Sequence, residues 1–300
     1  MDLKPLINLC EHFNIQYEIN AKTAPYNSFR VGKEAKIIIF PHSIEVFVEI
    51  LRYISSANIK YIVLGNGTNS YFCDYYDGVV IITKKLNDVK VNKNKITAMC
   101  GADLTAISEI AHDESLLGAE FLYGIPGAIG GGVYMNASAF GSSISDIVFE
   151  SLVFDINEKT IKTIIYDEHL FGIKTSVFSK FHSYIVLKTS FVLSYGDKEE
   201  IWKKMNDYIL KRKNTQPLDF PSAGSVFIKP KDNYASKLID MAGLKGLRIG
   251  GAEVSKKHAG FIVNVNNASA KDINALISHI KIKVKNTYNY ELKEEIIYIE

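Results

Sequence analysis

The chain has 300 residues with a formal net charge of +2, and 47% of its residues are hydrophobic. A net charge this small gives no bulk electrostatic case for binding nucleic acid or an anionic membrane. The sequence has no run of about 18 apolar residues, so no membrane-spanning helix is expected. The first residues do not have the pattern of a signal peptide. Cys10, Cys73 and Cys100 form no CxxC pair, which favours a reducing compartment over disulfides or zinc. A cytoplasmic location is therefore expected.

The first hundred residues alternate between strand and helix patterns. Strand patterns occur at 36–40, 61–64 and 78–83, and a hairpin pattern occurs at 89–100. Apolar residues recur at helical spacing over 43–58, where Ser43 is a plausible N-cap. A second helix is expected over 103–115, with Asp103 as its cap. This alternation indicates an α+β or α/β chain.

The later residues also mix strand and helix patterns, and the last portion of the chain reads as a separate domain. Strands are expected at 147–155, 161–166, 184–193, 224–228, 261–265 and 294–299. Helices are expected at 198–212, 234–242 and 271–285. We place a domain boundary near Gly196, before this last portion. We therefore expect three domains, at 1–83, 84–196 and 197–300.

Two loops are rich in glycine. Six of the nineteen residues in YGIPGAIGGGVYMNASAFG, 123–141, are glycine, whereas the whole chain has only 20. The sequence GNGTNS, 65–70, nearly matches GxGxxG but leads into another strand pattern instead of a helix, so a Rossmann unit is not expected. A plain turn and an anion-binding nest of N–H groups both remain open for this loop. Without a P-loop lysine motif, the two loops indicate two sides of one elongated, phosphate-bearing cofactor.

Six segments carry a resemblance to a known family, in the family's order. They are Asn27–Ala35, Val63–Asp74, Phe121–Gly141, Pro221–Pro230, Gly243–Asn264 and Leu292–Ile299. Together they resemble the UDP-N-acetylenolpyruvoylglucosamine reductase family, in its shorter subtype, over nearly the whole chain. The resemblance implies an α+β chain with the two-lobed FAD-binding fold of the vanillyl-alcohol oxidase and p-cresol methylhydroxylase type. A C-terminal α/β substrate domain would follow it.

The family's chemistry implies an oxidoreductase that completes UDP-N-acetylmuramate for peptidoglycan. NADPH reduces non-covalently bound FAD, which then passes hydride to UDP-N-acetyl-3-O-(1-carboxyvinyl)-glucosamine while a serine supplies a proton. The resemblance thus implies the cofactors FAD and NADPH and a small UDP-sugar substrate. The seven histidines show no HxxxH or HExxH spacing, so no metal site is expected. We expect no nucleic-acid partner, no membrane insertion, and a monomer or weak dimer.

The resemblance assigns three catalytic positions. The serine falls on Ser225 in PSAGSVFIKP, and the glutamate falls on Glu295, which we expect in the final strand. The family's arginine position is occupied by Lys174 in FGIKTSVF, with Ile173 where tyrosine is usual. Lysine keeps the positive charge but lacks the planar fork that grips a carboxylate. The alternatives are a turn serine, an exposed strand-end carboxylate and a solvated loop lysine.

The resemblance also assigns binding positions. The expected cofactor residues are Arg30, Gly65, Asn66, Gly67, Thr68, Asn69, Gly124, Ile125, Pro126, Gly127, Gly130 and Gly131. The expected substrate residues are Arg212, Gln216 and Lys229, although basic residues at a helix end also suit the helix dipole. His258 is expected to support the fold.

Two other functions remain open. Lys174 could mark a catalytically weakened paralogue that binds flavin or nucleotide. A flavin oxidase of the same fold could act on another small acid.

Overall fold

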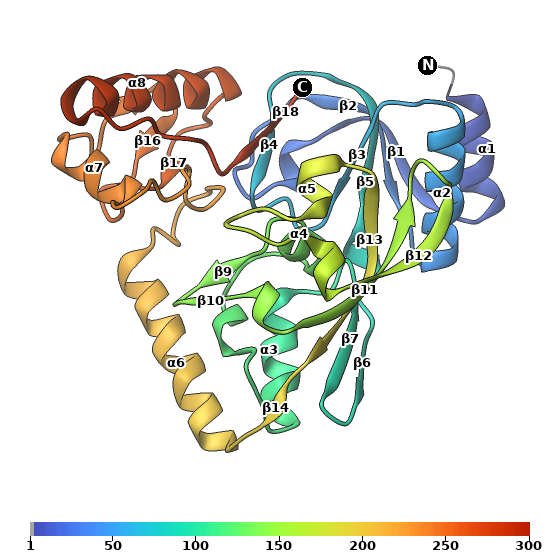
Figure 1. The fold of residues 1–300 in the computed structure, drawn as a ribbon. Coiled ribbons are helices and arrows are strands. Elements are labelled where there is room, and N and C mark those ends of the chain that lie inside the picture. Colours follow the sequence, from blue (N-terminus) through green and yellow to red (C-terminus); the bar gives the residue numbers. More distant parts are fainter. Residues whose placement is uncertain (1–2) are drawn as a thin grey trace. The chain divides into compact units, whose positions relative to one another are not determined.

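Helices and strands are mixed along residues 3–300, the part of the chain that the computed structural model describes, which confirms the expected α+β class (Figure 1). The chain folds into two compact units, each built from separate stretches. Unit 1 consists of the chain up to Ile19, Ile37–Asn66 and Gly78–Leu210. Unit 2 consists of Asn20–Lys36, Gly67–Asp77 and Lys211–Glu300. The division into three consecutive domains stays a prediction, although most of the expected third domain lies in unit 2.

Unit 1 holds most of the regular structure. Its helices are α1 (Lys4–His12), α2 (Ile44–Ser56), α3 (Leu104–Asp113), α4 (Ile129–Tyr134) and α5 (Val177–Phe181), and α6 (Lys198–Thr215) continues into unit 2. Its strands are β3 (Tyr61–Leu64), β6 (Val89–Asn92), β7 (Lys95–Met99), β8 (Leu116–Leu117), β9 (Ser138–Ala139), β10 (Ser142–Ser143), β11 (Val148–Asp155), β12 (Thr160–Ile165), β13 (Tyr184–Val192) and β14 (Ser194–Tyr195). Short 3₁₀ helices lie at Thr83–Lys85, Glu120–Leu122, Ile144–Asp146 and Tyr166–His169.

Two sheets form the centre of unit 1. One has the order β12-β11-β13-β7-β6, and all of its neighbouring strands are antiparallel. The other has the order β1-β2-β5-β3, in which β1 (Gln16–Lys22), β2 (Glu34–Phe40) and β5 (Tyr76–Ile82) each run on into unit 2. The pair β3–β5 is parallel. The expected strands at 36–40, 61–64 and 78–83 and the hairpin at 89–100 are thus confirmed.

Helix α2 shows why its residues form a helix. The Ser43 hydroxyl accepts a hydrogen bond from the Val46 N–H at 3.3 Å, so the predicted N-cap is confirmed. The apolar residues buried at helical spacing are Ile44, Phe47, Ile50, Leu51 and Ile54. This face joins the core of unit 1. Asp103 occupies the N-cap position of α3, as predicted, but its side chain makes no capping hydrogen bond to that helix.

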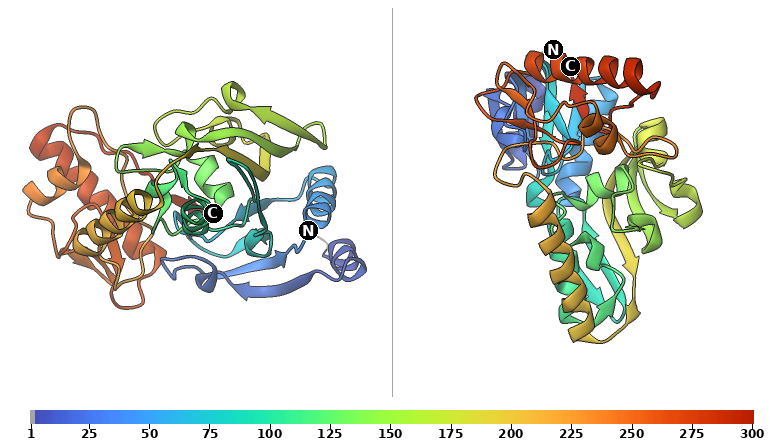
Figure 2. Two further views of the ribbon diagram at one scale, coloured as in Figure 1. Left: turned by 90° about the horizontal axis from the view of Figure 1, so that it is seen from below. Right: turned by 90° about the vertical axis from the view of Figure 1, so that its left-hand side faces the viewer.

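Unit 2 is built around α8 (Ala270–Tyr288) and a small sheet. Its other elements are α7 (Ala235–Met241), β4 (Ser70–Phe72), β15 (Arg248–Ile249), β16 (Ala252–Val254), β17 (Ile262–Asn264), β18 (Ile297–Ile299) and a 3₁₀ helix at Ala24–Tyr26. Helix α8, red in Figure 1 and Figure 2, packs against α7 and against the antiparallel sheet β15-β16-β17. Strand β18 pairs in parallel with β4. The apolar face predicted for 271–285 is buried in the core of this unit.

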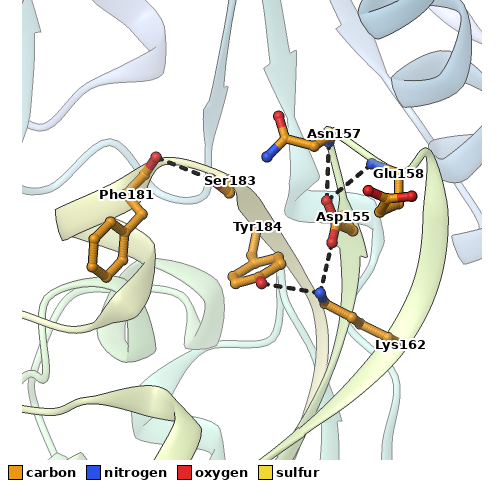
Figure 3. A network of polar contacts seen from close by, with 7 residues as sticks. All are labelled: Asp155, Asn157, Glu158, Lys162, Phe181, Ser183 and Tyr184. Atoms are coloured by element: carbon orange, nitrogen blue, oxygen red, sulfur yellow. Dashed lines mark hydrogen bonds and ion pairs between the residues drawn. The ribbon is translucent and has the colours of Figure 1, made fainter.

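A polar network fixes the end of the β11–β12 hairpin (Figure 3). The buried Asp155 carboxylate accepts hydrogen bonds from Lys162 Nζ at 2.6 Å and from the N–H groups of Asn157 and Glu158. Lys162 also donates to the Tyr184 hydroxyl at 3.0 Å. Burial acts to raise the pKa of Asp155, but these hydrogen bonds outweigh it and hold the pKa below its ordinary value.

This network makes part of the stability of the chain dependent on pH. We expect Asp155→Ala to lower the free energy of unfolding near pH 7 by about 1–3 kcal/mol, because two backbone donors lose their acceptor. Since the folded-state pKa of Asp155 is lowered, its contribution is present above the ordinary value of 3.8 and is lost as the pH falls further. Urea unfolding at several pH values measures this. The exposed Asp88→Ala is the matched control, and an equal effect of both variants would contradict the role of the network.

Candidate active site

Ser225 lies in a segment of unit 2 that is bonded on both sides. The strand predicted at 224–228 is wrong, because its hydrogen bonds alternate between two neighbours and form only isolated bridges. The Val226 N–H donates to Gly260 O at 2.9 Å on one side. The Val226 carbonyl accepts from the Glu295 N–H at 2.8 Å on the other. Ser225 itself is half-buried and follows Gly224, whose φ of +77° favours glycine.

Glu295 lies directly beside this segment. It is half-buried and precedes β18, so the prediction that it lies within the final strand is wrong. Both of its backbone groups are engaged, since its carbonyl accepts a hydrogen bond from the Asn69 side-chain amide at 3.0 Å. The structure thus brings together the segments of Ser225 and Glu295, which are seventy residues apart in the sequence.

The part of the GNGTNS loop in unit 2 contacts the Glu295 segment directly. Gly67 has a φ of +60°, and a side chain there would collide with the backbone of Tyr26 and Asn27. The Gly67 carbonyl accepts from the Ser28 N–H at 3.0 Å, and the Asn69 carbonyl accepts from the Ile297 N–H at 2.9 Å. Within residues 3–300, the N–H of Thr68 has no hydrogen-bond acceptor. This N–H can therefore donate to a ligand.

Arg30 lies in the loop that precedes β2. Its φ is +56°, and its side chain is exposed. The Asn27 side chain braces this loop, because it donates to Val31 O at 2.8 Å and accepts from the Val31 N–H at 3.2 Å. The strained backbone thus presents Arg30 to solvent.

In unit 1, the two glycine-rich loops touch each other. A side chain on Gly65 would come within 2.6 Å of the Ala128 Cβ, so only glycine allows this approach. The Asn66 amide donates to the Asp103 carboxylate at 2.5 Å, and the Leu104 N–H donates to Gly127 O at 2.8 Å. Asp103, which also forms an isolated bridge with Ala128, therefore links the two loops and makes no side-chain capping bond to α3.

The glycines of 124–131 differ in what their N–H groups can bind. The Gly124 N–H donates to Thr105 Oγ1 at 3.1 Å, and the Gly130 N–H donates to Cys100 O at 2.7 Å. The N–H groups of Ile125 and Gly127 also bond within the protein, and Pro126 has none. Gly131 is exposed with open space beside its Cα. It is the member of this loop whose surroundings leave most room for a ligand.

Lys174 occupies a tight turn of unit 1. Its φ is +55°, and the turn is closed by two hydrogen bonds between Gly172 and Thr175, of 3.0 and 3.3 Å. The neighbouring Ile173 is 81% exposed. Lys174 thus belongs to unit 1, whereas Ser225 and Glu295 belong to unit 2.

A basic groove of about 630 Å³ lies on unit 2. Its lining includes Tyr234, Lys237, Asp240, Lys245, Lys257 and His258. Lys229, an expected substrate residue, holds its Nζ 4.3 Å from the centre of the Tyr234 ring. The other two differ from it, because Arg212 is buried, which lowers its pKa, and Gln216 is half-buried at the end of α6. Among these three residues, Lys229 therefore has the clearest contact with a groove residue.

His258 organises a turn beside the Ser225 segment. Its Nδ1 accepts from the Gly260 N–H at 3.2 Å, and its ring packs edge-on against Phe261. Burial, helped by the charge of Lys245, lowers its pKa. This geometry is the structural support predicted for His258.

Sequence reasoning missed Ser28 and the link made by Asp103. Ser28 Oγ donates to Ser222 O at 2.6 Å, three residues before Ser225. The signal was the position of Ser28 in the NSFRVG segment, but nothing in that segment indicates a partner 194 residues away. Within residues 3–300, no group of three or more His, Cys, Asp or Glu residues is placed to hold a metal ion.

We expect His258 to make the stability of unit 2 fall on mild acidification. Because its folded-state pKa is lowered, the unfolded chain takes up a proton below the ordinary value of 6.5 that the folded ring excludes. Urea unfolding of the wild type and of His258→Asn at about pH 8 and pH 5.5 measures this. The wild type should lose more stability between the two than the variant. Equal losses would contradict the role of the neutral ring.

Two family models match separate parts of the chain. An FAD-binding domain model matches residues 35–163, and the model of the UDP-N-acetylenolpyruvoylglucosamine reductase C-terminal domain matches residues 216–299. UDP-N-acetylenolpyruvoylglucosamine reductase of Clostridium novyi (strain NT) is 42% identical over 90% of this chain and 88% of its own length. That of Clostridium beijerinckii is 40% identical over 94% of this chain and 92% of its own.

Solved structures show the same fold. The reductase structure from Thermus caldophilus aligns with a TM-score of 0.80 and 28% identity, over 95% of this chain and 99% of that one. An alkyldihydroxyacetonephosphate synthase structure shares the fold over 65% of this chain and 41% of its own, with a TM-score of 0.50 and 14% identity. The expected FAD-binding fold of the vanillyl-alcohol oxidase type, followed by a C-terminal domain, is confirmed. The chain, an oxidoreductase, therefore belongs to the UDP-N-acetylenolpyruvoylglucosamine reductase family.

Proposed function

We propose that this protein reduces UDP-N-acetyl-3-O-(1-carboxyvinyl)-glucosamine to UDP-N-acetylmuramate, with NADPH and non-covalently bound FAD. The observation that carries the proposal is the hydrogen bond between the Glu295 N–H and the Val226 carbonyl, 2.8 Å long. This bond sets the two residues that the family's chemistry needs, Ser225 and Glu295, on neighbouring segments of one unit. Family membership at 42% identity over 90% of the chain supports it further.

Each unit has residues that suit a cofactor phosphate. The N–H of Thr68 is available, Gly131 leaves open space beside its backbone, and Arg30 is an exposed cation. Asn66 would serve mainly through its bond to Asp103, which holds the first glycine-rich loop against the second. Bound FAD would supply the hydride that reduces the enolpyruvyl double bond.

Ser225 would hold the proton that the reaction consumes. A serine hydroxyl is a weak acid, so it donates only as negative charge builds on the substrate carbon beside it, in a site that excludes water. The half-buried position of Ser225 in a segment bonded on both sides suits this task. Glu295 would orient the substrate at the developing enolate.

The groove of unit 2 suits the anionic part of the substrate. Lys237, Lys245 and Lys257 line it, and Asp240 is already paired with Lys245 at 2.6 Å. We assign the UDP-sugar phosphates to this groove, with Lys229 in contact with Tyr234, one of its lining residues. Arg212 and Gln216 stay predicted substrate residues. A cytoplasmic location and a monomer or weak dimer likewise stay predictions, and no helix within residues 3–300 is long and apolar enough to span a membrane.

A catalytically weakened paralogue is the second candidate, because Lys174 stands at the family's arginine position. Lysine offers a compact charge where arginine would make two parallel hydrogen bonds to a carboxylate. The tight turn at Gly172–Thr175 nevertheless holds this cation at a defined backbone position. We assign Lys174 to the substrate carboxylate.

Anaerobic half-reactions test the proposed function. NADPH should bleach the flavin absorbance, and the enolpyruvyl substrate should restore it. Ser225→Ala should leave bleaching unchanged and slow the recovery by about 10²- to 10⁴-fold, since it removes the proton source. The exposed Ser56→Ala is the matched control. Recovery at the wild-type rate in Ser225→Ala would contradict its role, and no recovery in the wild type would favour the paralogue or an oxidase.

The assignment of Lys174 has its own test. We expect Lys174→Arg to lower the KM for the enolpyruvyl substrate by about threefold to tenfold, because a charge-assisted bidentate pair gains about 1 kcal/mol over a single contact. Steady-state kinetics with saturating NADPH measures this. An unchanged KM, with Lys174→Ala equally unchanged, would place Lys174 outside the substrate site.

Alanine substitutions at two neighbouring glycines of α4 distinguish an effect on FAD binding from an effect on folding. Gly131→Ala meets open space, so the free energy of unfolding should not fall, whereas its affinity for FAD should weaken. Gly130→Ala would approach Cys100 to 3.1 Å, and it should lower the unfolding free energy by about 1–3 kcal/mol. Urea unfolding of the apoprotein and flavin titration measure the two effects. Unchanged FAD affinity in Gly131→Ala would contradict the assignment of this loop to the cofactor.

A further inference from the structure

We propose that Asn69 and Ser28 are positioning residues that use the Gly67–Asn69 loop to hold the segments of Glu295 and Ser225 in register. The inference rests on the proposed function, because it assumes that those two residues act on the substrate. It goes beyond that function by giving one face of this loop a task other than cofactor binding.

The first arm runs from Asn69 to Glu295. The Asn69 amide nitrogen donates to Glu295 O at 3.0 Å, and the Asn69 carbonyl accepts from the Ile297 N–H at 2.9 Å. Asn69 therefore bonds to the residues on both sides of Ile296. Its side chain bonds to Glu295, and its backbone carbonyl bonds to Ile297. The side-chain bond reaches further back than the β18–β4 ladder, which begins at Ile297.

Glu295 needs such support because no strand contains it. Its N–H donates to Val226 O, and its carbonyl accepts from Asn69, so both bonds lead to segments with proposed roles. The N–H and the carbonyl of Glu295 belong to the two peptide planes that flank its Cα, so each of these planes is held by one hydrogen bond. The Cα that carries the Glu295 side chain is thereby fixed as well.

The second arm runs from Gly67 to the Ser225 segment. The Ser28 N–H donates to Gly67 O at 3.0 Å, and the Ser28 hydroxyl donates to Ser222 O at 2.6 Å. A parallel connection strengthens it, since Asn264 donates its side-chain amide to Phe29 O at 3.0 Å and its N–H to Pro221 O at 2.9 Å. The loop thus reaches the residues just before Ser225 through Ser28.

The two arms begin at opposite ends of a three-residue loop. Thr68 lies between them with an N–H that has no acceptor within the described residues. A ligand phosphate at Thr68 would therefore stiffen the piece of backbone from which both arms extend. Cofactor occupancy and the placement of Ser225 and Glu295 are coupled through this loop.

The test compares half-reactions of Asn69→Ala with those of the wild type at saturating FAD. We expect recovery with the enolpyruvyl substrate to slow by about 10- to 100-fold more than bleaching by NADPH does, because small misplacements of a reacting group slow the step in which that group acts. In a Glu295→Gln background, Asn69→Ala should add little further slowing, because both changes act through the same side chain. Asn94→Ala, which removes a comparable amide bond to Leu193 O in unit 1, is the matched control.

Two outcomes would overturn the proposal. One is recovery at the wild-type rate once FAD is saturating, which would leave Asn69 a cofactor ligand only. The other is equal slowing from Asn69→Ala in both backgrounds. If Asn69→Ala does not retain FAD, the same comparison on Ser28→Ala, with Ser225→Ala as the background, decides the question by the same criteria.

A substrate-free measurement separates this inference from the proposed function. Amide hydrogen exchange of Glu295 should speed up in Asn69→Ala relative to the wild type, and in Asn94→Ala it should not. Failure of the wild type to recover its absorbance contradicts the proposed function alone. Unchanged exchange at Glu295 contradicts the positioning role alone.

Discussion

The parallel pairing of β18 with β4 is the interaction on which the arrangement of unit 2 depends. It sets Ile297 opposite Ser70 and Ile299 opposite Phe72, and so joins the end of the chain to a stretch more than 200 residues earlier. Asn69 directly precedes β4, and Glu295 lies two residues before β18, so the pairing brings their backbones together. A slip of one residue would turn every side chain of β18 to the opposite face and remove this match.

The residues of the two glycine-rich loops have two different roles. Gly65 and Gly130 allow backbones to approach closely, against Ala128 and Cys100. Gly131 and the N–H of Thr68 remain accessible. Asp103 gives up the capping bond that its position on α3 favours and accepts from Asn66 instead. A residue that forgoes a local stabilising bond in this way is characteristic of a functional region.

Local patterns in the sequence predicted most of the elements, because the alternation of apolar residues and the cap at Ser43 act over a few positions. The errors lie in segments whose secondary structure depends on pairing with residues distant in the sequence. The segment at 224–228 has the composition of a strand but divides its hydrogen bonds between Gly260 and Glu295, and the final strand begins only at Ile297. The composition of unit 2 from three separate stretches could not be predicted, since each contact between them joins residues distant in the sequence. The candidate residues came from the resemblance, whereas Ser28 required the structure.

The most direct test of the proposed site is a crystal structure of the protein with FAD and the enolpyruvyl substrate bound. We expect the Ser225 hydroxyl and the Glu295 carboxylate both to contact the substrate, with the Thr68 N–H on a cofactor phosphate and Asn69 still bonded to Glu295 O. A substrate bound away from Ser225, or a Glu295 carboxylate directed into solvent, would contradict the proposed site.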